Sequence, residues 1–312
     1  MRSILTFLFC SIYSLCSAQF ITEEKTLTTT SGNLAGTLMI PANGKKYKLV
    51  VIQAGSGPTD RNGNSGNAVK ANSYRLIAEA LAAKNIATLL VDKRGIAKSA
   101  TAMKSEAAMR FDDFADDLAA WISFMKKDKR ISKIFIAGHS EGSLVGMIAA
   151  QKEKVNGYIS IAGAGESIDK IIIWQYAQQS PKEAVVVDSL FSRMKNGQKL
   201  DIVPPFLFPI FRPSVQPYIL SWMLHDPCTE MKKLNIPILI LQGTTDIQVT
   251  MKQATILKEC KPNATLQIFE GMNHILKQAP EERMKNIASY TDEKLPVSPA
   301  LITSIVKFVQ KK

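Results

Sequence analysis

The most constraining feature of the sequence is the pentapeptide Gly138-His139-Ser140-Glu141-Gly142. An apolar run at residues 134–137 precedes it, and residues 144–150 after it have the composition of a buried helix. A serine on a G-x-S-x-G turn between a strand and a helix is held in a strained backbone conformation that raises its hydroxyl above the sheet. The same pattern also arises by chance in ordinary turns from strand to helix. The rest of the chain therefore decides whether Ser140 is a nucleophile.

The remainder of the sequence has the pattern of one large α/β domain. Its 312 residues, 46% of them hydrophobic, are enough for a sizeable core. Most of the predicted strands are short apolar runs separated by amphipathic helical patterns, as expected of parallel strands covered on both faces. Strands are expected near residues 21–30, 34–40, 48–53, 87–91, 133–137, 157–162, 236–241 and 265–269, and the clearest helices near 73–84, 112–127, 144–152, 251–259 and 299–309. We therefore predict a mostly parallel eight-stranded sheet with helices on both faces.

The alternation of strands and helices is interrupted between residues 163 and 225. This segment contains helix-like stretches and a run rich in proline and phenylalanine, but no pattern of a buried strand. We interpret residues 163–225 as a cap inserted into a core made of residues 19–162 and 226–312. Phe206, Phe208 and Phe211 are candidates for the apolar wall of a substrate pocket, and the alternative is ordinary packing between cap and core.

Residues 1–18 have the features of a secretory signal peptide. Arg2 precedes the apolar run 4–15, and the small residues Ser17 and Ala18 follow it. The run is short for a membrane span, and the residues before Cys16 make a poor lipoprotein signal, so a retained anchor and a lipoprotein are the lesser alternatives. We expect cleavage after Ala18 and export, without a stable membrane span, to the periplasm or the exterior of the cell.

The two cysteines outside that segment are Cys228 and Cys260. An oxidising compartment would permit a disulfide between them. However, Cys228 is expected at the start of the helix before one core strand and Cys260 at the end of the helix after it, which suggests opposite edges of the sheet. Because the Cα atoms of a disulfide lie within about 7 Å, we predict that the two cysteines are unpaired.

The charge pattern argues against a nucleic-acid partner. The formal net charge is +12, but the basic residues are scattered, and the densest run, residues 126–130, is interpreted as a solvated helix end. Three dispersed histidines and no Cys-x-x-Cys pair provide no recognisable metal site, and the early strand-to-helix turns lack G-x-G-x-x-G. We therefore expect no metal, no cofactor and no nucleic acid. The sequence carries no indication of an oligomeric state.

A serine hydroxyl is a weak nucleophile that needs a base to take its proton and an acid to orient that base. Of the three histidines, His139 lies inside the pentapeptide and His225 in or near the insertion, whereas His274 follows the last predicted strand, at the sheet edge where Ser140 emerges. Asp246 follows the strand before it, in the order Ser, Asp, His of hydrolases with this architecture. We predict Ser140, Asp246 and His274 as a catalytic triad; a turn or helix cap is the alternative for Asp246.

Acyl transfer also needs donors aimed at the developing oxyanion, and backbone amides usually serve. The Glu141 N–H is the first candidate. The second is expected in the loop 54–64, where glycines let the backbone approach a substrate; Ser56 is preferred, with Gly55 and Gly57 as alternatives. A phosphate-binding loop is a poor interpretation because no Gly-Lys-Ser/Thr follows.

Together these residues resemble the α/β-hydrolase superfamily, and more closely its serine aminopeptidase-like and dienelactone hydrolase-like secreted bacterial esterases. The resemblance runs from about Ile21 to the C-terminus and rests on residues 55–64, Asp92-Lys93-Arg94-Gly95 with Ser99, residues 138–142, Gly243 with Asp246, Gln248 and Val249, and Asn273-His274. It implies the α/β-hydrolase fold with a helical cap and the same triad. Many relatives have His-Gly where this chain has Ala54-Gly55. The difference changes a side chain but removes no backbone amide, so the oxyanion hole is expected to be kept.

Four charged residues of the resembling motifs have structural interpretations beside functional ones. Asp60 and Arg61 are expected to hold the loop, to pair with each other or to contact substrate. Asp92 and Arg94 match a structural turn of the family, so they are left out of the catalytic set.

The predicted activity is the hydrolysis of small-molecule carboxylic esters through an acyl-enzyme on Ser140. The first alternative is a serine aminopeptidase or other peptidase with the same triad, in which Glu166 and Asp169 would bind the substrate amine. The second is a catalytically silent binding protein on the same scaffold, which would be expected to have an incomplete triad.

Overall fold

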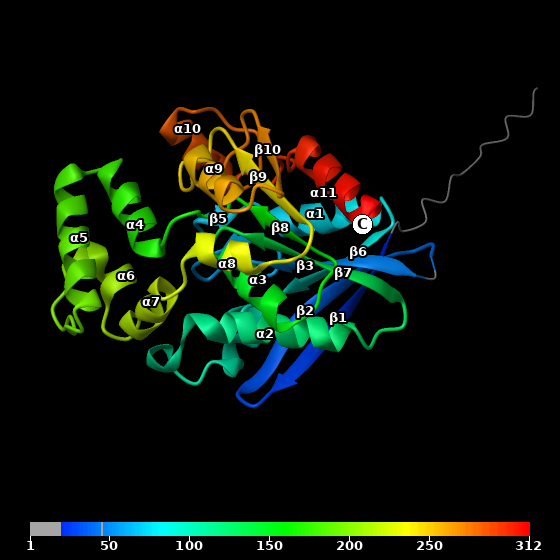
Figure 1. The fold of residues 1–312 in the computed structure, drawn as a ribbon, viewed down its shortest axis with the longest axis horizontal. Coiled ribbons are helices and arrows are strands. Elements are labelled where there is room, and N and C mark those ends of the chain that lie inside the picture. The colour runs from blue at the N-terminus through cyan, green and yellow to red at the C-terminus, as the bar shows by residue number, and fades with distance from the viewer. Residues whose placement is uncertain (1–19, 45) are drawn as a thin grey trace, which may run out of the picture.

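The computed structural model describes residues 20–44 and 46–312, so the predicted signal peptide lies outside the described residues. One eight-stranded sheet forms the centre of the molecule, with the strand order β1-β2-β6-β3-β7-β8-β9-β10 (Figure 1). Its strands are β1 (Phe20–Thr29), β2 (Gly32–Pro41), β3 (Tyr47–Gln53), β6 (Ile86–Val91), β7 (Ile131–His139), β8 (Gly157–Ile161), β9 (Ile238–Gly243) and β10 (Thr265–Phe269). The eight predicted strands are confirmed, with ends that shift by at most two residues.

Helices connect most of these strands. They are α1 (Ser73–Ala82), α2 (Phe111–Met125), α3 (Glu141–Lys152), α4 (Ile168–Ala177), α5 (Pro181–Lys195), α6 (Phe208–Phe211), α7 (Gln216–Met223), α8 (Pro227–Lys233), α9 (Met251–Cys260), α10 (Arg283–Ala288) and α11 (Pro299–Lys311). The 3₁₀ helices η1 (Ala97–Ala102), η2 (Glu106–Ala108), η3 (Pro205–Leu207) and η4 (Ser289–Thr291) and the short strand pair β4 (Asn64–Ser65) and β5 (Val69–Lys70) lie in loops. In the described part of the chain, no helix is long and apolar enough to cross a bilayer.

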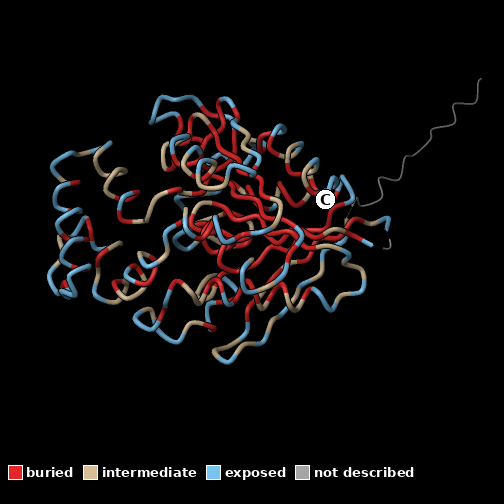
Figure 2. The backbone as a smooth tube through the Cα atoms, viewed as in Figure 1, coloured by how far each residue is buried: buried red, intermediate tan, exposed pale blue. Residues whose placement is uncertain are grey.

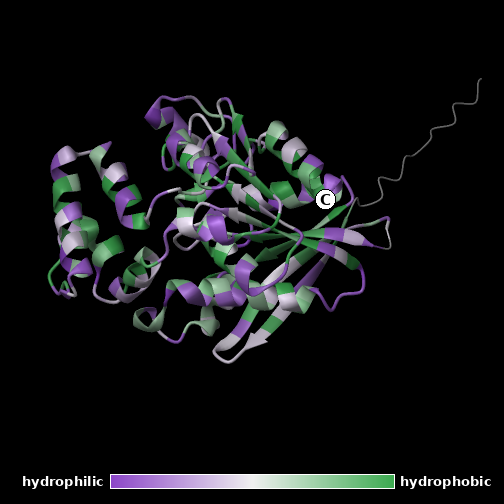
Figure 3. Cartoon of the chain, viewed as in Figure 1, coloured by the Kyte–Doolittle hydropathy of each residue, from purple (hydrophilic) through white to green (hydrophobic). Residues whose placement is uncertain are grey.

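The sheet is parallel from β6 to β10, and β2 pairs antiparallel with β1 and with β6. Alternate residues of the central strands face opposite sides, so Leu49 and Val51 belong to one apolar cluster and Val50 and Ile52 to the other. The first cluster packs against α2, α3 and α9, and the second against α1 and α11. Buried, hydrophobic strands therefore occupy the middle of the molecule (Figures 2 and 3).

Helices α4 to α7 lie beside the sheet and form the group at the left of Figure 1. We call residues 168–223 the cap. Its helices bury an apolar set of their own that is continuous with the first cluster, with Val187, Leu190, Phe191, Leu207 and Phe211 among its members. The cap follows β8, whose carboxyl end lies at the sheet edge from which Ser140 also emerges.

The prediction that the cysteines are unpaired is wrong. Cys228 and Cys260 form a disulfide with a Cα–Cα distance of 5.5 Å. Helix α9 runs back along β9, so its last residue returns to the edge where β9 begins. The preceding helix, α8, has only seven residues and packs beside α9 near that edge. The sequence argument placed the two cysteines correctly, at the start of α8 and the end of α9, but wrongly inferred opposite edges of the sheet, because a helix as short as α8 keeps both of its ends near one edge.

The disulfide is expected to contribute substantially to stability, because it closes a loop with a sequence separation of 32. On chain-entropy grounds, its removal in a Cys228→Ala/Cys260→Ala variant should lower the free energy of unfolding by about 3 to 4 kcal/mol. Urea unfolding of the two proteins measures this loss, and reduced wild-type protein should lose a similar amount. Detection of both cysteines as free thiols in the unreduced wild-type protein would contradict the assignment.

Candidate active site

Ser140 stands on the sharp turn between β7 and α3. Its backbone has φ 54° and ψ −121°, a strained conformation for a residue with a side chain. Two glycines permit the turn: a Cβ on Gly138 would collide with the carbonyl of Gly142, and one on Gly142 would collide with the carbonyl of Gln53 at the end of β3. The close approach of α3 to β7 and β3 therefore requires glycine at both positions, and it presents Ser140 at the carboxyl edge of the sheet.

Asp246 and His274 lie on the loops after β9 and β10 and are in contact. The Nδ1 atom of His274 is 2.8 Å from Oδ2 of Asp246, and both side chains are buried. Because a carboxylate only accepts, Nδ1 of His274 carries the proton and Nε2 is left as the basic nitrogen. The other carboxylate oxygen of Asp246 accepts the N–H groups of Gln248 and Val249, both at 2.8 Å. The carboxylate is thus fixed by backbone donors in the orientation that binds His274.

His139 connects the turn of Ser140 with the loop of His274. Its Nε2 is 2.9 Å from the His274 carbonyl oxygen, and its Nδ1 is 2.8 Å from the Tyr74 hydroxyl. The carbonyl only accepts, so Nε2 carries the proton, Nδ1 accepts from Tyr74, and the Tyr74 oxygen in turn accepts the Gly55 N–H at 3.2 Å. The rings of His139 and His274 are 4.8 Å apart. Ser140, the next residue along the chain, is therefore held against the loop of the candidate base.

Burial lowers the pKa of His139 from its usual 6.5 to about 3, and the neighbouring His274 ring adds to the effect. Between these pH values the unfolded chain binds a proton at this histidine that the folded protein does not. The free energy of unfolding should therefore be highest above pH 6.5 and fall as the pH is lowered toward 3. Urea unfolding at pH 7 and pH 4.5 should show a smaller fall for His139→Gln than for the wild type. Equal losses would contradict the assignment.

The amides proposed for an oxyanion hole lie beside Ser140. Ser56, Glu141 and Ser140 line the same cavity. The loop of Ser56 packs directly on the nucleophile turn, because a Cβ on Gly55 would be only 3.1 Å from the Ser140 Cβ. Within the described part of the chain, neither the Ser56 N–H nor the Glu141 N–H donates to a protein acceptor. Both amides are thus available for a ligand oxygen.

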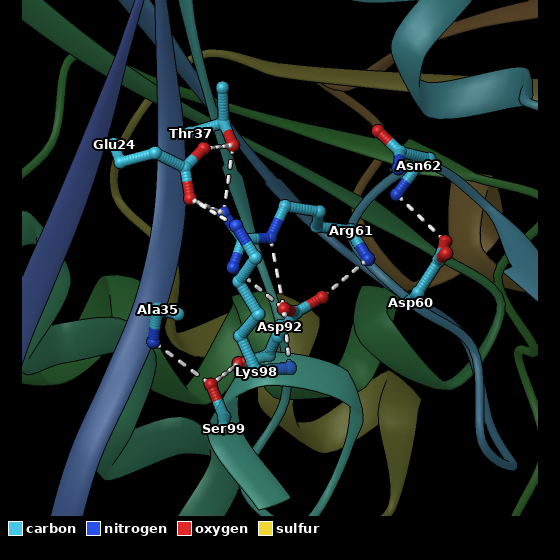
Figure 4. Close-up of polar contacts among 9 residues, drawn as sticks. All are labelled: Glu24, Ala35, Thr37, Asp60, Arg61, Asn62, Asp92, Lys98 and Ser99. Carbon is cyan, nitrogen blue, oxygen red and sulfur yellow. Dashed lines mark hydrogen bonds and ion pairs between the residues drawn. The ribbon is translucent and has the colours of Figure 1, made fainter.

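Arg61 anchors this loop to the sheet, and Figure 4 shows the contacts. Its guanidinium binds Asp92 through Nε at 2.9 Å and Nη2 at 2.7 Å, and its backbone N–H donates to the same carboxylate. Thr37 of β2 accepts from Nη1 at 2.7 Å. Asp60 does not pair with Arg61 but accepts the N–H groups of Asn62 and Asn64. Asp60 and Arg61 therefore hold the loop in place. Of the three roles considered from the sequence, this is the structural one.

A cavity of about 560 Å³ extends from Ser140 beneath the cap. Apolar side chains of both cap and core form most of its lining, among them Met103, Met109, Phe114, Leu144, Ile168, Ile171, Ile172, Ile210, Val215, Ile219 and Trp222. Its volume is within the range of cavities that hold small organic ligands. The space beside Ser140 therefore suits a largely apolar group.

The three phenylalanines predicted to line this cavity do not do so. Phe206 and Phe208 are about half exposed, at 48% and 52%, and Phe211 is buried inside the cap. Leu207 and Phe211 are four residues apart and share the inner side of η3 and α6, which turns Phe206 and Phe208 outward. The same segment lines the cavity with Pro209 and Ile210 instead.

Glu166 and Asp169, the carboxylates suggested for binding the amine of a peptide substrate, already have partners within the protein. Asp169 is buried and bound to Lys195, away from the cavity lining. Glu166 lines the cavity, but Gln253 donates to its carboxylate at 2.7 Å. His225, the remaining histidine, is 3.2 Å from the Asp112 carboxylate and packs on Phe111.

Sequence reasoning missed the side chains that support the loops of the candidate site from behind. Tyr74 comes from α1, and Asn286 of α10 donates to the Thr245 carbonyl at 2.8 Å, next to Asp246. Lys93 extends from the end of β6 to the Gly55 carbonyl. Lys93 stands in a motif that carries the resemblance, but no role was predicted for it, and no local pattern marks Tyr74 or Asn286, because each of the three acts on a loop that is distant in the sequence.

Comparisons with known proteins agree with this architecture. Residues 64–203 match the family model of serine aminopeptidases, S33. The chain is 28% identical to esterase EstD of Thermotoga maritima over 275 residues, which cover 84% of this chain but only 63% of that protein. Its structure is similar to Est1E of Butyrivibrio proteoclasticus, with a TM-score of 0.62 and 17% identity over 93% of this chain and 99% of that one. It is also similar to the Pyrococcus furiosus esterase Pf2001, with a TM-score of 0.60 and 14% identity over 94% and 91% of the two chains.

At 17% and 14% identity these structural similarities indicate the fold, and the sequence matches show similarity to a serine aminopeptidase family and to an esterase. The matched region contains the turn with Ser140, and the eight-stranded sheet carries it at the edge expected for such a fold. The chain therefore has the α/β-hydrolase fold, and part of its sequence is similar to the serine aminopeptidases, S33.

Proposed function

We propose that the protein hydrolyses carboxylic esters, with Ser140 as nucleophile, His274 as base and Asp246 as the acid that orients it. The observation that supports this most directly is the buried pair of His274 and Asp246 beside the strained turn of Ser140. Ser140 also lines an apolar cavity, and two backbone N–H groups beside it, those of Ser56 and Glu141, have no acceptor in the described part of the chain. A purely structural role of Ser140 would not explain this combination.

The chemistry would proceed in two steps. The Ser140 Oγ attacks the ester carbonyl carbon while Nε2 of His274 takes its proton, and the N–H groups of Ser56 and Glu141 stabilise the tetrahedral oxyanion. Collapse of this intermediate breaks the bond to the alcohol, which leaves with the proton from His274. In the second step, Nε2 of His274 takes a proton from water, and the water oxygen attacks the carbonyl carbon of the acyl-enzyme. His274 then returns the proton to the Ser140 oxygen, and the carboxylic acid is released.

The cavity defines the class of ester. Its lining is mainly apolar, and its volume of about 560 Å³ exceeds the needs of an acetyl group. We propose substrates with a medium-length aliphatic or an aromatic group next to the scissile ester. Each additional buried CH₂ contributes up to about 0.8 kcal/mol, or roughly fourfold in kcat/KM, until the cavity is full.

The cavity carboxylates favour an esterase over an aminopeptidase. Glu106 is bound to Arg212 and Ser214, Glu141 to Lys93 and Tyr218, and Glu166 to Gln253. A protonated substrate amine would have to compete with these partners. A catalytically silent binding protein is the other alternative, and the contact between Asp246 and His274 speaks against it.

Hydrolysis of p-nitrophenyl esters from acetate to dodecanoate, with an alanyl and a prolyl arylamide in parallel, tests the proposal. We expect turnover of esters with kcat/KM rising from acetate to an intermediate chain length, and negligible cleavage of the arylamides. Cleavage of the arylamides alone would establish a peptidase. No turnover of either class, together with no labelling by a fluorophosphonate probe, would reject the serine hydrolase.

We further propose that the protein is exported after cleavage behind Ala18. The charge, apolar run and small residues of 1–18 support this, as does the disulfide, since such bonds persist in oxidising compartments. Expression of the full chain in a bacterial host, with cell fractionation and mass determination of the N-terminus, tests it. A mature chain beginning at Gln19 outside the cytoplasm is expected, and an intact N-terminus in the cytoplasm would contradict it.

A further inference from the structure

Lys93 is a buried cation just after β6 that the proposed mechanism leaves without a role. Its side chain is 3% exposed, yet it lies beside the cavity and the nucleophile turn. Its ammonium group donates to the Gly55 carbonyl and, at 3.2 Å, to the carboxylate of Glu141. It also lies 5.2 Å from the centre of the Phe114 ring. A buried charge is costly unless each partner is well placed, so these contacts call for an explanation.

The Gly55 carbonyl and the Ser56 N–H belong to one peptide group. A trans peptide is planar, so its N–H points opposite to its carbonyl oxygen. A cation bound to the oxygen fixes the orientation of the whole group. It also draws electron density toward the oxygen and makes the N–H a stronger donor, because linked hydrogen bonds polarise one another in a low-dielectric environment.

We propose that Lys93 is a positioning residue of the oxyanion hole, orienting and polarising the Gly55–Ser56 peptide so that the Ser56 N–H binds the transition-state oxyanion more strongly. The inference rests on the proposed function, because it takes Ser56 as an oxyanion donor. On the other side of Gly55, Tyr74 accepts the N–H, so that both polar groups of this residue are held by buried side chains.

Glu141 completes the arrangement. Its carboxylate balances the charge of Lys93, while its backbone N–H is the other candidate oxyanion donor. The second carboxylate oxygen accepts the hydroxyl of Tyr218 from α7 of the cap. A group of three side chains in contact, Lys93, Glu141 and Tyr218, thus connects both candidate oxyanion amides with the cap. Lys93 acts on the Ser56 N–H only through the Gly55–Ser56 peptide group. We therefore expect Lys93 to stabilise the transition state, which raises kcat, and to leave substrate binding unchanged.

The test compares Lys93→Met with the neutral pair Lys93→Met/Glu141→Gln. The single variant leaves a buried carboxylate without its cation and is expected to be less stable. The double variant removes that imbalance and should recover stability. If Lys93 served only to balance charge, the double variant would also recover activity. On the present proposal, the kcat of the double variant stays about 10- to 100-fold below that of the wild type, and its KM is nearly unchanged. This loss is smaller than the one expected when a whole oxyanion donor is removed.

Two further readouts separate this role from others. The affinity for an alkyl trifluoromethyl ketone, whose adduct with Ser140 carries an oxyanion, should fall by the same factor as kcat/KM. The amide proton of Ser56 should move upfield in the NMR spectrum of the double variant, whether or not the protein turns over esters. Lys48→Met is the matched control, because Lys48 donates to the backbone carbonyls of Val309 and Gln310 at the far end of β3.

A double variant with wild-type kcat and an unmoved Ser56 resonance would overturn the proposal, and so would a loss confined to KM, which would make Lys93 a substrate contact. Failure of the proposed function has a different signature, since the wild-type protein would then neither hydrolyse esters nor react with the ketone, while the Ser56 resonance would still report on Lys93.

Discussion

Ser140→Ala is expected to abolish ester hydrolysis almost completely, with kcat reduced about a millionfold, as in serine hydrolases that lose their nucleophile. In the proposed mechanism the hydroxyl oxygen forms the bond of the acyl-enzyme, and no other group in the turn can replace it. The fold should survive, because the φ of 54° that Ser140 adopts is no less accessible to alanine. Ester turnover, fluorophosphonate labelling and thermal unfolding of the purified variant together measure the effect.

Ser143 supplies the matched control. It lies one turn along α3, fully buried, and its hydroxyl bonds to Tyr158 and Ser160 away from the cavity. Ser143→Ala should lose some stability but keep its rate of hydrolysis within a fewfold of the wild type. Activity retained in Ser140→Ala, or probe labelling that persists in it, would show that another residue is the nucleophile.

Asp246→Asn is expected to lower kcat by about four orders of magnitude through the tautomer of His274. The Oδ1 position of Asp246 accepts two backbone N–H groups, at 2.8 Å each, so the amide oxygen of the asparagine will occupy it. The amide NH₂ then faces Nδ1 of His274, where the carboxylate accepted at 2.8 Å. The imidazole must place its proton on Nε2 instead, and that nitrogen can no longer accept the proton of Ser140.

The new NH₂ group also meets the side-chain amide of Gln242, which donates to Oδ2 of Asp246 at 3.1 Å and would have to rotate so that its oxygen accepts instead. With that adjustment, KM and thermal stability should be less affected than kcat. Asp226→Asn is a suitable control, because Asp226 is an exposed cap of α8 that accepts the Thr229 N–H. A steady-state comparison on the best p-nitrophenyl ester measures both variants. A kcat for Asp246→Asn within tenfold of the wild type would rule out Asp246 as the acid that orients the base.

Most of the architecture could be predicted because its signals are local. Apolar runs of strand length, helical periodicity between them and the glycines around Ser140 each depend on residues close in sequence. The order Ser140, Asp246, His274 could be read because parallel strands bring their carboxyl ends to one edge, so loops after different strands meet there. The short elements β4, β5 and α10 escaped prediction, since two to six residues carry too little periodicity to be recognised.

The errors share a physical cause. The disulfide between Cys228 and Cys260 depends on the path of α9 back past a very short α8, and the outward direction of Phe206 and Phe208 depends on which side of one helical turn meets the cap core. Neither is encoded in the identity of the residues themselves. Both follow from how elements pack, where a shift of one turn or one residue reverses the outcome.

The sequence by itself thus determined the class of fold, the sharp turn at Ser140 and the choice of three residues for the proposed triad, because backbone sterics and strand order act over short stretches and regular repeats. Only the tertiary structure decided what surrounds them: the buried chain from Gly55 through Tyr74 and His139 to His274, the contact of Lys93 with the oxyanion loop, and the apolar cavity beneath the cap. These are contacts between residues 19 to 135 positions apart, whose partners are selected by packing of the whole chain and not by any local pattern.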